Sequence, residues 1–295
     1  MAINVDVVRN WQFPELRQTY AARDTILYGL ALGYGSDPAN EADLRFVYEA
    51  NLLALPTMAV VLCHPGFWIS DPATGVDATK VVHGEQFCTF HKPLAATGSL
   101  VGRAKVTAVL DKGRGKGALV ITERVLADAA TGQAIATLEQ RTLCRGDGGF
   151  DEAAAAAAGA GAAPARAATT APVADAKPDL VVDLPTLPQA ALIFRLSADP
   201  NPLHADPAVA RAAGFPRPIL HGLCSYGIAA RAIVQSCCVG DPHALRHLGV
   251  RFSAPLFPGE TLRTEIWRDG NGIRFRCLAA ERNVVVMSNG SAGVG

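Results

Sequence analysis

The chain has 295 residues, of which 49% are hydrophobic, and can therefore bury a sizeable core as one large or two modest domains. Lysine plus arginine equals aspartate plus glutamate at 27 each, so no net charge draws it to nucleic acid or to an anionic membrane. No stretch approaches the roughly 18 uninterrupted apolar residues of a membrane span. We expect a soluble globular protein without nucleic-acid or membrane partners.

The seven cysteines follow no CxxC or mixed Cys/His ligand spacing, and Cys237 and Cys238 are adjacent. This pattern argues against a disulfide framework and against a structural zinc site, so we expect reduced and mostly buried thiols. The first residues lack the apolar run of a signal peptide, and the last residues are not a peroxisomal address. A cytoplasmic location is the expectation.

Residues 151–178 form a low-complexity run of alanine, glycine, proline and threonine without apolar periodicity, which is typical of a mobile linker. The linker would separate an N-terminal half, residues 1–150, from a C-terminal half, residues 179–295. Two segments, "FCTFHKPL" from Phe87 and "VRFSAPLF" from Val250, share a pattern in which an aromatic residue is followed by a proline-leucine pair. This similarity indicates a weak internal duplication.

Small or apolar residues alternate with polar ones from Leu100 to Leu110, which predicts a strand. The sequence "KGRGKG" at 112–117 would form the tip of a hairpin, and two more strands are expected around Thr131 and Gly132. In the C-terminal half, residues 260–287 predict three strands, with "DGNG" at 269–272 as a tight turn.

Residues 221–238 form an apolar run of helical length whose polar exceptions, Arg231 and Gln235, lie four apart. A helix that is apolar on nearly every other side should be wrapped by a curved sheet. The corresponding segment of the N-terminal half contains Pro56 and Pro65, so its helix should be short or broken. That difference would leave room for a ligand.

Three segments carry a family resemblance: "SADPNPLHADP" at 197–207, "PILHGLCSYG" at 218–227 and "FSAPLFPGETL" at 252–262. They resemble the signature of the MaoC-like (R)-specific enoyl-CoA hydratases, known as hydratase 2. The N-terminal half contains "LRFVYEANLLALPTMAVV" at 44–61 and "HGEQFCTFHKPL" at 83–94. With these segments it resembles the non-catalytic half of their two-domain, eukaryote-type members. The resemblance implies an α+β double hot-dog fold, with two antiparallel sheets each wrapped around a central helix. It also implies hydration of trans-2-enoyl-CoA to (3R)-3-hydroxyacyl-CoA.

By the same resemblance, Asp199 and His204 are the catalytic pair, Asn201 lies in their loop, and the Gly222 amide faces the thioester oxygen. The residue types suit the reaction, because adding water to a conjugated thioester needs a base, an acid and donors for the enolate oxygen. Which of the pair handles which proton stays open. His221 and Arg251 are candidate substrate contacts, although His221 is more simply explained as a structural residue at the helix start.

The N-terminal half should be catalytically silent and provide space for the acyl chain. Asp24 is the expected counterpart of Asp199, but no histidine follows it five residues later. His64, His83 and His91 are interpreted as structural. We expect an acyl-CoA substrate, no metal, no cofactor beyond the coenzyme A of the substrate, and a homodimer.

Three alternatives remain. A 3-hydroxyacyl thioester dehydratase would run the same chemistry in reverse, on coenzyme A or acyl carrier protein. A hot-dog thioesterase would release a free thiol from acyl-CoA. A non-catalytic acyl-CoA binding subunit would bind without turnover. Since these activities share a fold, the site has to distinguish them.

Overall fold

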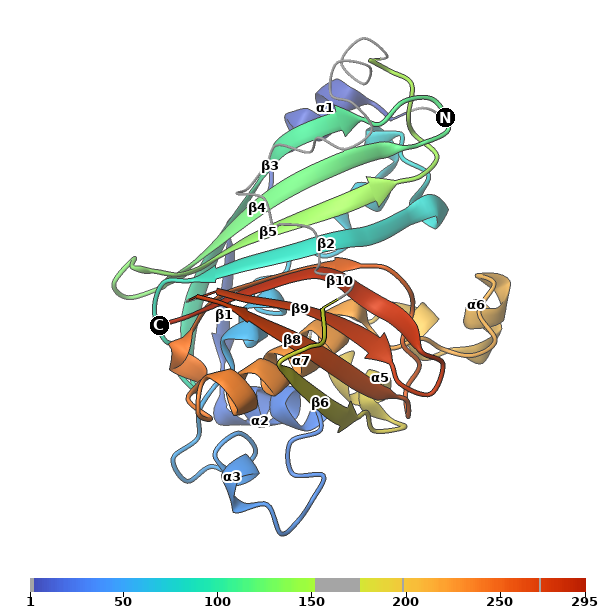
Figure 1. Ribbon diagram of the computed structural model, residues 1–295. Coiled ribbons are helices and arrows are strands. Elements are labelled where there is room, and N and C mark those ends of the chain that lie inside the picture. Colours follow the sequence, from blue (N-terminus) through green and yellow to red (C-terminus); the bar gives the residue numbers. More distant parts are fainter. Residues whose placement is uncertain (1–2, 152–175, 198, 271) are drawn as a thin grey trace.

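The computed structural model of the chain describes residues 3–151, 176–197, 199–270 and 272–295. The central part of the predicted linker, residues 152–175, lies outside the described residues. The described strands form one antiparallel sheet in the order β1-β3-β4-β5-β2-β7-β10-β9-β8-β6 (Figure 1). They are β1 Leu16–Tyr20, β2 Val81–Phe90, β3 Gly98–Asp111, β4 Ala118–Asp128, β5 Ala134–Cys144, β6 Leu180–Pro185, β7 Leu245–Phe252, β8 Thr261–Asp269, β9 Gly272–Ala279 and β10 Val284–Val294.

The helical segments of the described residues are mostly short. The α-helices are α1 Val5–Arg9, α2 Ala22–Ala31, α3 Glu41–Leu44, α5 Ala190–Phe194, α6 Pro207–Ala212 and α7 Gly222–Cys237. The 3-10 turns are η1 Pro56–Val60, η2 Trp68–Ser70, η3 Pro72–Thr74, η4 Ala78–Lys80, η6 Pro202–His204 and η7 Pro242–Ala244.

Strands β2 and β7 join the two halves of the sheet by pairing antiparallel, from Glu85 opposite Arg251 to Thr89 opposite His247. Five strands precede residue 152 and five follow residue 175. The two joining strands both end in phenylalanine, Phe90 and Phe252, at the repeated openings seen in the sequence. The arrangement is α+β and of the double hot-dog kind.

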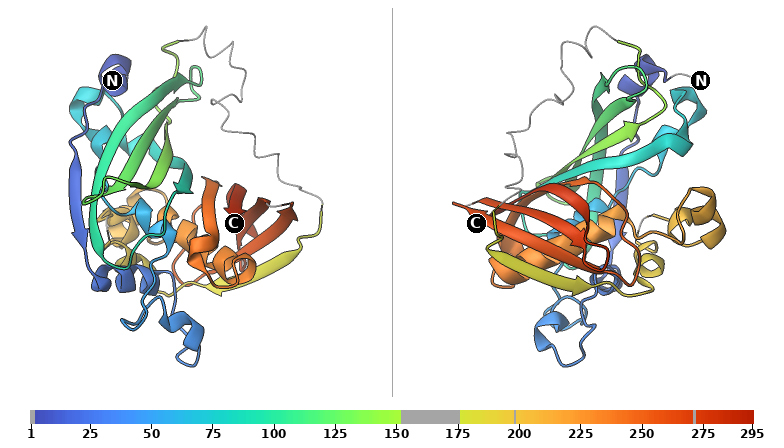
Figure 2. Two further views of the ribbon diagram at one scale, coloured as in Figure 1. Left: turned by 90° about the vertical axis from the view of Figure 1, so that its left-hand side faces the viewer. Right: turned by 45° about the vertical axis from the view of Figure 1, so that its right-hand side comes forward.

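The predicted helix at 221–238 is confirmed as α7, Gly222–Cys237. Its residues from Cys224 to Val234 are all buried, and the C-terminal strands curve over it (Figures 1 and 2). The N-terminal half has only the five-residue turn η1 at the corresponding place, which begins at Pro56. The predicted interruption of that helix is therefore also confirmed.

The predicted strands of both halves are confirmed as well. The alternating segment from Leu100 to Leu110 lies within β3, and residues 112–117 connect β3 to β4. In the C-terminal half the predicted turn at 269–272 joins β8 to β9, with residue 271 outside the described part. The short edge strands β1 and β6 were not predicted, because each is only five or six residues long.

The two halves share a core across the faces of α7 and α2. A Cβ on Gly227 of α7 would lie 2.7 Å from the Leu32 side chain and 2.8 Å from the Tyr28 hydroxyl. On the same helix Arg231 donates to Asp43 Oδ2 at 3.1 Å and to the Leu32 carbonyl at 3.0 Å. The polar residue Arg231 of the predicted helix is thus buried, in an ion pair between the halves.

All seven cysteines are free thiols; Cys237 is half-buried and the other six are buried, as predicted. Helices long and apolar enough to cross a membrane are not found in the described part of the chain.

Candidate active site

A short hydrogen-bonded loop presents Asp199. Its Oδ1 accepts the backbone amide of Asn201 at 3.0 Å, and Asn201 Oδ1 accepts the amide of Leu203 at 3.0 Å. Asn201 is thereby the N-cap of η6, whose first residue is Pro202. The Asn201 side chain holds the loop, while Asp199 Oδ2 is left facing His204. The Asp199 side chain remains 42% exposed, so a substrate can reach it.

His204 lies at the end of that loop and is buried. Its Nδ1 donates to the Ile219 carbonyl at 2.9 Å, because a carbonyl oxygen can only accept. In the neutral ring Nε2 therefore carries a lone pair, and it lies 4.0 Å from Asp199 Oδ2. Burial lowers the pKa of His204, against the opposing effects of the Ile219 carbonyl and the Asp199 carboxylate. The distance is too long for a direct hydrogen bond and suits one bridging water.

His221 connects the start of α7 to this loop. Its ring stacks on His204 with centroids 3.7 Å apart, and Phe194 packs against it at 5.0 Å. Its Nε2 donates to the Asp199 carbonyl at 3.2 Å, and its Nδ1 is buried without a partner among the described residues. Burial, together with the neighbouring His204, lowers the pKa of His221 to about 4. His221 thus fixes the backbone that carries the carboxylate.

Gly222 is the first residue of α7, so its amide has no acceptor within the helix and lies at the positive end of the helix dipole. A Cβ at this position would lie 3.2 Å from the ring of Phe252. The glycine therefore allows Phe252 to pack against the helix start. It also leaves a backbone donor beside His221.

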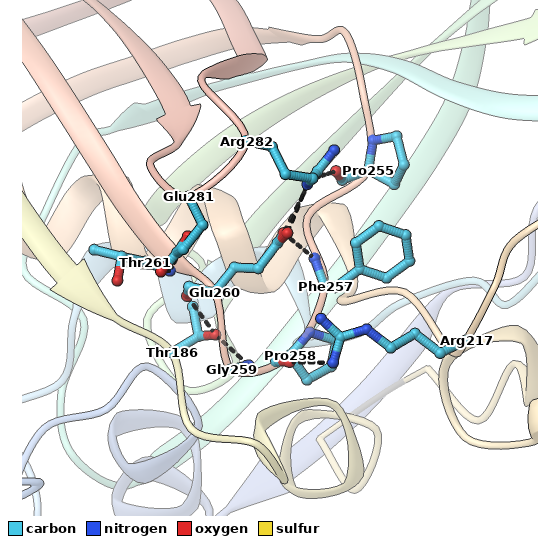
Figure 3. A network of polar contacts seen from close by, with 10 residues as sticks. All are labelled: Thr186, Arg217, Pro255, Phe257, Pro258, Gly259, Glu260, Thr261, Glu281 and Arg282. Carbon is cyan, nitrogen blue, oxygen red and sulfur yellow. Dashed lines mark hydrogen bonds and ion pairs between the residues drawn. The ribbon is translucent and has the colours of Figure 1, made fainter.

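A buried carboxylate organises the loop that supports this helix start (Figure 3). Glu260 accepts the Phe257 amide at 2.8 Å and both Nε and Nη2 of Arg282, at 2.6 and 2.9 Å. The same loop accepts a hydrogen bond at the Leu256 carbonyl from the Leu220 amide at 2.8 Å, directly before His221. The segment "FSAPLFPGETL" thus holds the start of α7 in place.

Two histidines of the N-terminal half, His64 and His83, were interpreted as structural from the sequence. The His83 ring packs against Phe252, with centroids 4.9 Å apart. Burial lowers the pKa of His83 to about 4 and that of His64 to about 3, while the Asp199 carboxylate acts on both in the opposite direction. The pairing of β2 with β7 brings the His83 ring to Phe252, which the sequence alone did not predict.

Arg251 is not brought to the pair. It is exposed on β7, opposite Glu85 in the β2 register. Side chains alternate along a strand, so Arg251 points away from the face on which its neighbour Phe252 meets Gly222.

The expected equivalence of Asp24 with Asp199 is wrong. Asp24 lies in the first turn of α2 and accepts the Ala21 amide at 2.8 Å, as a cap of that helix. Asp199, in contrast, follows the short helix α5. The two aspartates thus occupy different places relative to their helices.

The donor atoms of Asp199, His204 and His221 lie within 4.8 Å of one another. Two imidazoles and a carboxylate are ligands that transition metals accept, so these three residues are where a metal could be held. Two of the three, Asp199 and His204, are also the residues expected to carry acid-base chemistry.

Comparison with known proteins covers both halves. Residues 169–289 match the MaoC like domain, and residues 18–146 match the MFE-2 hydratase 2 N-terminal domain. A relative from Arabidopsis thaliana, "Enoyl-CoA hydratase 2, peroxisomal", is 34% identical over 97% of this chain and 94% of its own length. "3-hydroxyacyl-thioester dehydratase Y" of Mycobacterium tuberculosis is 39% identical over 85% of this chain and 82% of its own.

A crystal structure of a MaoC-like dehydratase from Phytophthora capsici superposes with a TM-score of 0.82 at 32% identity, covering 99% of both chains. With both half-domains matched in order and relatives similar over nearly the whole length, the chain belongs to the MaoC-like hydratase 2 family in its two-domain form.

Proposed function

We infer that this chain hydrates trans-2-enoyl-CoA to (3R)-3-hydroxyacyl-CoA, as a hydro-lyase. The observation that carries the inference is the placement of Asp199 Oδ2 and His204 Nε2, which face each other across 4.0 Å beside the start of α7. The family membership of both halves supports the same reaction. In this proposal Asp199 and His204 are the catalytic residues.

The reacting water would lie between the two acceptors. It donates one hydrogen to Asp199 Oδ2 and the other to His204 Nε2, which turns an oxygen lone pair toward C3 of the substrate. His204 is suited to this role because its Nδ1 proton is held by the Ile219 carbonyl, leaving Nε2 as an acceptor. Asp199 is held by Asn201 and by His221 on either side. Because the fold holds both side chains in position, no conformational search is needed to bring them to the water.

The water oxygen bonds to C3 while one of the pair takes a proton, and the C2–C3 double bond becomes an enolate. A proton is then delivered to C2, so the product has gained one water in total. The negative oxygen of the enolate needs a donor, and the Gly222 amide at the positive end of α7 supplies one. The pair shares the two proton transfers, as coupled groups do.

The reverse reaction is the second candidate. The relative named 3-hydroxyacyl-thioester dehydratase has 39% identity to this chain, and the same three groups serve either direction by microscopic reversibility. Substrate supply would then decide whether water is added or removed.

We propose that no metal or cofactor takes part, because the pair and the Gly222 amide already provide a base, an acid and an oxyanion donor. Hydratase activity should then be unchanged after prolonged dialysis against EDTA. A loss that added Zn²⁺ or Mn²⁺ restores would instead assign a metal to Asp199, His204 and His221.

Location and assembly are also proposals. Seven free cysteines suit a reducing compartment, for which we propose the cytoplasm, while the name of the Arabidopsis relative places that protein in the peroxisome. Imaging of the tagged full chain separates the two. The sheet ends in β1 and β6, and pairing at such edges supports a homodimer, which light scattering after gel filtration would test.

The test of the function is a panel of trans-2-enoyl-CoAs of increasing chain length, followed by loss of the enoyl absorbance and chiral analysis of the product. The proposal expects 3R product and no free thiol. Thiol release would indicate a thioesterase, and tight binding without turnover would indicate a binding subunit. A 3S product would contradict the family-based stereochemistry.

A further inference from the structure

The concave face of the N-terminal sheet carries a band of polar side chains between two apolar clusters. On β4, Thr122 and Arg124 lie between Val120, which belongs to one cluster, and Leu126, which belongs to the other. These alternate positions share one face of the strand. On the neighbouring β5, Gln140 occupies the same band. In the C-terminal half the corresponding face is covered by the apolar helix α7.

The band lines a small pocket of about 30 Å³. Among its lining residues are Gln86, Thr122, Arg124 and Gln140 from the sheet, with His64 from the loop that follows the broken helix. Amides, a hydroxyl, an imidazole and a guanidinium thus line one part of this space, and the rest is lined by Phe13, Pro65, Gly66, Trp68, Ala104 and Leu138. An acyl-chain pocket meant for hydrocarbon alone would be lined by apolar side chains.

Arg124 is the unusual member of the band. It is only 9% exposed, and among the described residues no carboxylate pairs with it. It donates to the carbonyls of Val60 at 2.8 Å, Cys63 at 3.3 Å and Ala59 at 3.4 Å, while its Nε is buried without a partner. A buried guanidinium without a counter-ion is costly, and an oxygen ligand would offset that cost.

The pocket adjoins the catalytic half through β2. Gln86 of its lining lies three residues after His83, whose ring packs against Phe252 with centroids 4.9 Å apart. Phe252 in turn lies beside Gly222 at the start of α7. His64 lines the pocket together with Arg124. A substrate with C2 and C3 at Asp199 and its acyl chain beside the broken helix would extend toward this pocket, so that the far part of the chain would meet Arg124.

We propose that this chain selects acyl groups that carry an oxygen acceptor, a hydroxyl or a carboxylate, in the part of the chain that reaches Arg124. The proposal rests on the hydratase function proposed above and names its substrate class. The acceptor bonds to the free Nε of Arg124, and the amides of Gln86 and Gln140 complete a polar wall around it. Among these acceptors the guanidinium favours a carboxylate over a neutral hydroxyl.

The test measures kcat/KM of the full chain with trans-2-hexenoyl-, octenoyl-, decenoyl- and dodecenoyl-CoA. Each length is supplied with a methyl, a hydroxyl or a carboxyl group at the far end. At one or more lengths the oxygenated substrate should exceed the methyl-terminated one by about tenfold or more, as expected for one charge-assisted hydrogen bond. Comparison of the hydroxyl-terminated with the carboxyl-terminated substrates shows which acceptor Arg124 prefers. Equal or better turnover of the methyl series at every length would overturn the proposal.

Trans-2-butenoyl-CoA separates this proposal from the one on which it rests, since its acyl group is too short to reach the pocket. If it is hydrated while the oxygenated substrates show no advantage, the acyl selection is wrong and the hydratase function stands. If no enoyl-CoA in the panel is hydrated, the hydratase function fails and the selection fails with it.

Variants of the pocket residues test whether the preference for oxygenated substrates arises in this pocket. Arg124→Met should reduce the ratio of oxygenated to methyl-terminated turnover to about one, while turnover of butenoyl-CoA persists. Arg103→Met is the control, because Arg103 is exposed on β3 and pairs with Glu15. Should Arg124→Met not fold by circular dichroism, Gln140→Leu keeps the carbonyl contacts of Arg124 and should still lower the ratio. A ratio unchanged in the folded pocket variant would contradict the assignment.

Discussion

His204 and His221 stack face to face, with ring centroids 3.7 Å apart and planes 28° apart. Each ring also donates one nitrogen proton to a backbone carbonyl, His204 to Ile219 and His221 to Asp199. A charge on either ring would repel a charge on the other, and both are buried, so both stay neutral near pH 7. The stack therefore keeps a neutral base next to Asp199.

The activity should persist into mildly acidic solution. Burial lowers the pKa of His204 below its ordinary value of about 6.5, so the neutral form needed to accept a proton survives below that pH. We expect the acid limb of the kcat/KM profile with trans-2-butenoyl-CoA to lie below pH 6.5. An acid limb centred above pH 7 would contradict the assigned role of His204.

Stability should fall as the pH drops from about 6.5 to about 4. The pKa of His83 is about 4 in the folded chain and ordinary in the unfolded chain, so in this window the unfolded state binds more protons. Proton binding by the unfolded state therefore lowers the free energy of unfolding in this window. Above pH 6.5 the effect vanishes, because His83 is neutral in both states. Urea unfolding at several pH values should give a steep loss in the wild type and a shallower one in His83→Phe. Equal slopes in the two proteins would show that His83 does not contribute.

The glycine at the start of α7 should be sensitive to a single methyl group. Gly222→Ala places a Cβ 3.2 Å from the Phe252 ring, which must shift the helix start or the ring. Since the amide of this residue is the proposed oxyanion donor, kcat/KM should drop by about 10²-fold or more. Adding Phe252→Leu should restore part of the loss, because it relieves the contact. Full activity in Gly222→Ala alone would rule out the close packing as a requirement.

The ion pair between the halves should matter for stability and not for chemistry. The side chains of Arg231 and Asp43 are 7% and 3% exposed, so Asp43→Ala leaves a buried guanidinium unpaired and should cost about 3–5 kcal/mol in the free energy of unfolding. Asp183→Ala is the matched control. It breaks a pair with Arg263 that is 41% and 42% exposed, and should cost about 1 kcal/mol or less. Similar losses in the two variants would contradict the buried character of the first pair.

Local patterns in the sequence predicted much of this fold. The period-two alternation of β3 and the apolar length of α7 each specify an element by themselves, and Pro56 shortened the helix of the N-terminal half as expected. The edge strands β1 and β6 were not predicted, because five or six residues are too few to show a clear alternation of apolar and polar side chains. Asp24 was misplaced because its segment was compared by residue type, whereas the folded chain gives it a capping role at α2.

The spacing within one loop predicts that Asp199 and His204 lie together, whereas contacts between the two halves leave no such pattern in the sequence. Asp199 and His204 are five residues apart in a loop with two prolines, so their proximity follows from local geometry. His83 contacts Phe252 because β2 pairs with β7, and pairing over such a distance along the chain leaves no local signal. Arg251 was a candidate substrate contact from the sequence, and it is exposed on the face of β7 opposite to that of Phe252.

The central claim is that Asp199 and His204 act together on one water molecule. Its most direct test is a double-mutant cycle with Asp199→Asn and His204→Gln, measured as kcat/KM on trans-2-butenoyl-CoA with folding checked by circular dichroism. Each single variant should lose about 10²- to 10⁴-fold, and the double variant should be about as slow as the slower single one, because either change already disables the shared water. Losses that multiply in the double variant, or a single variant that retains wild-type turnover, would contradict the claim.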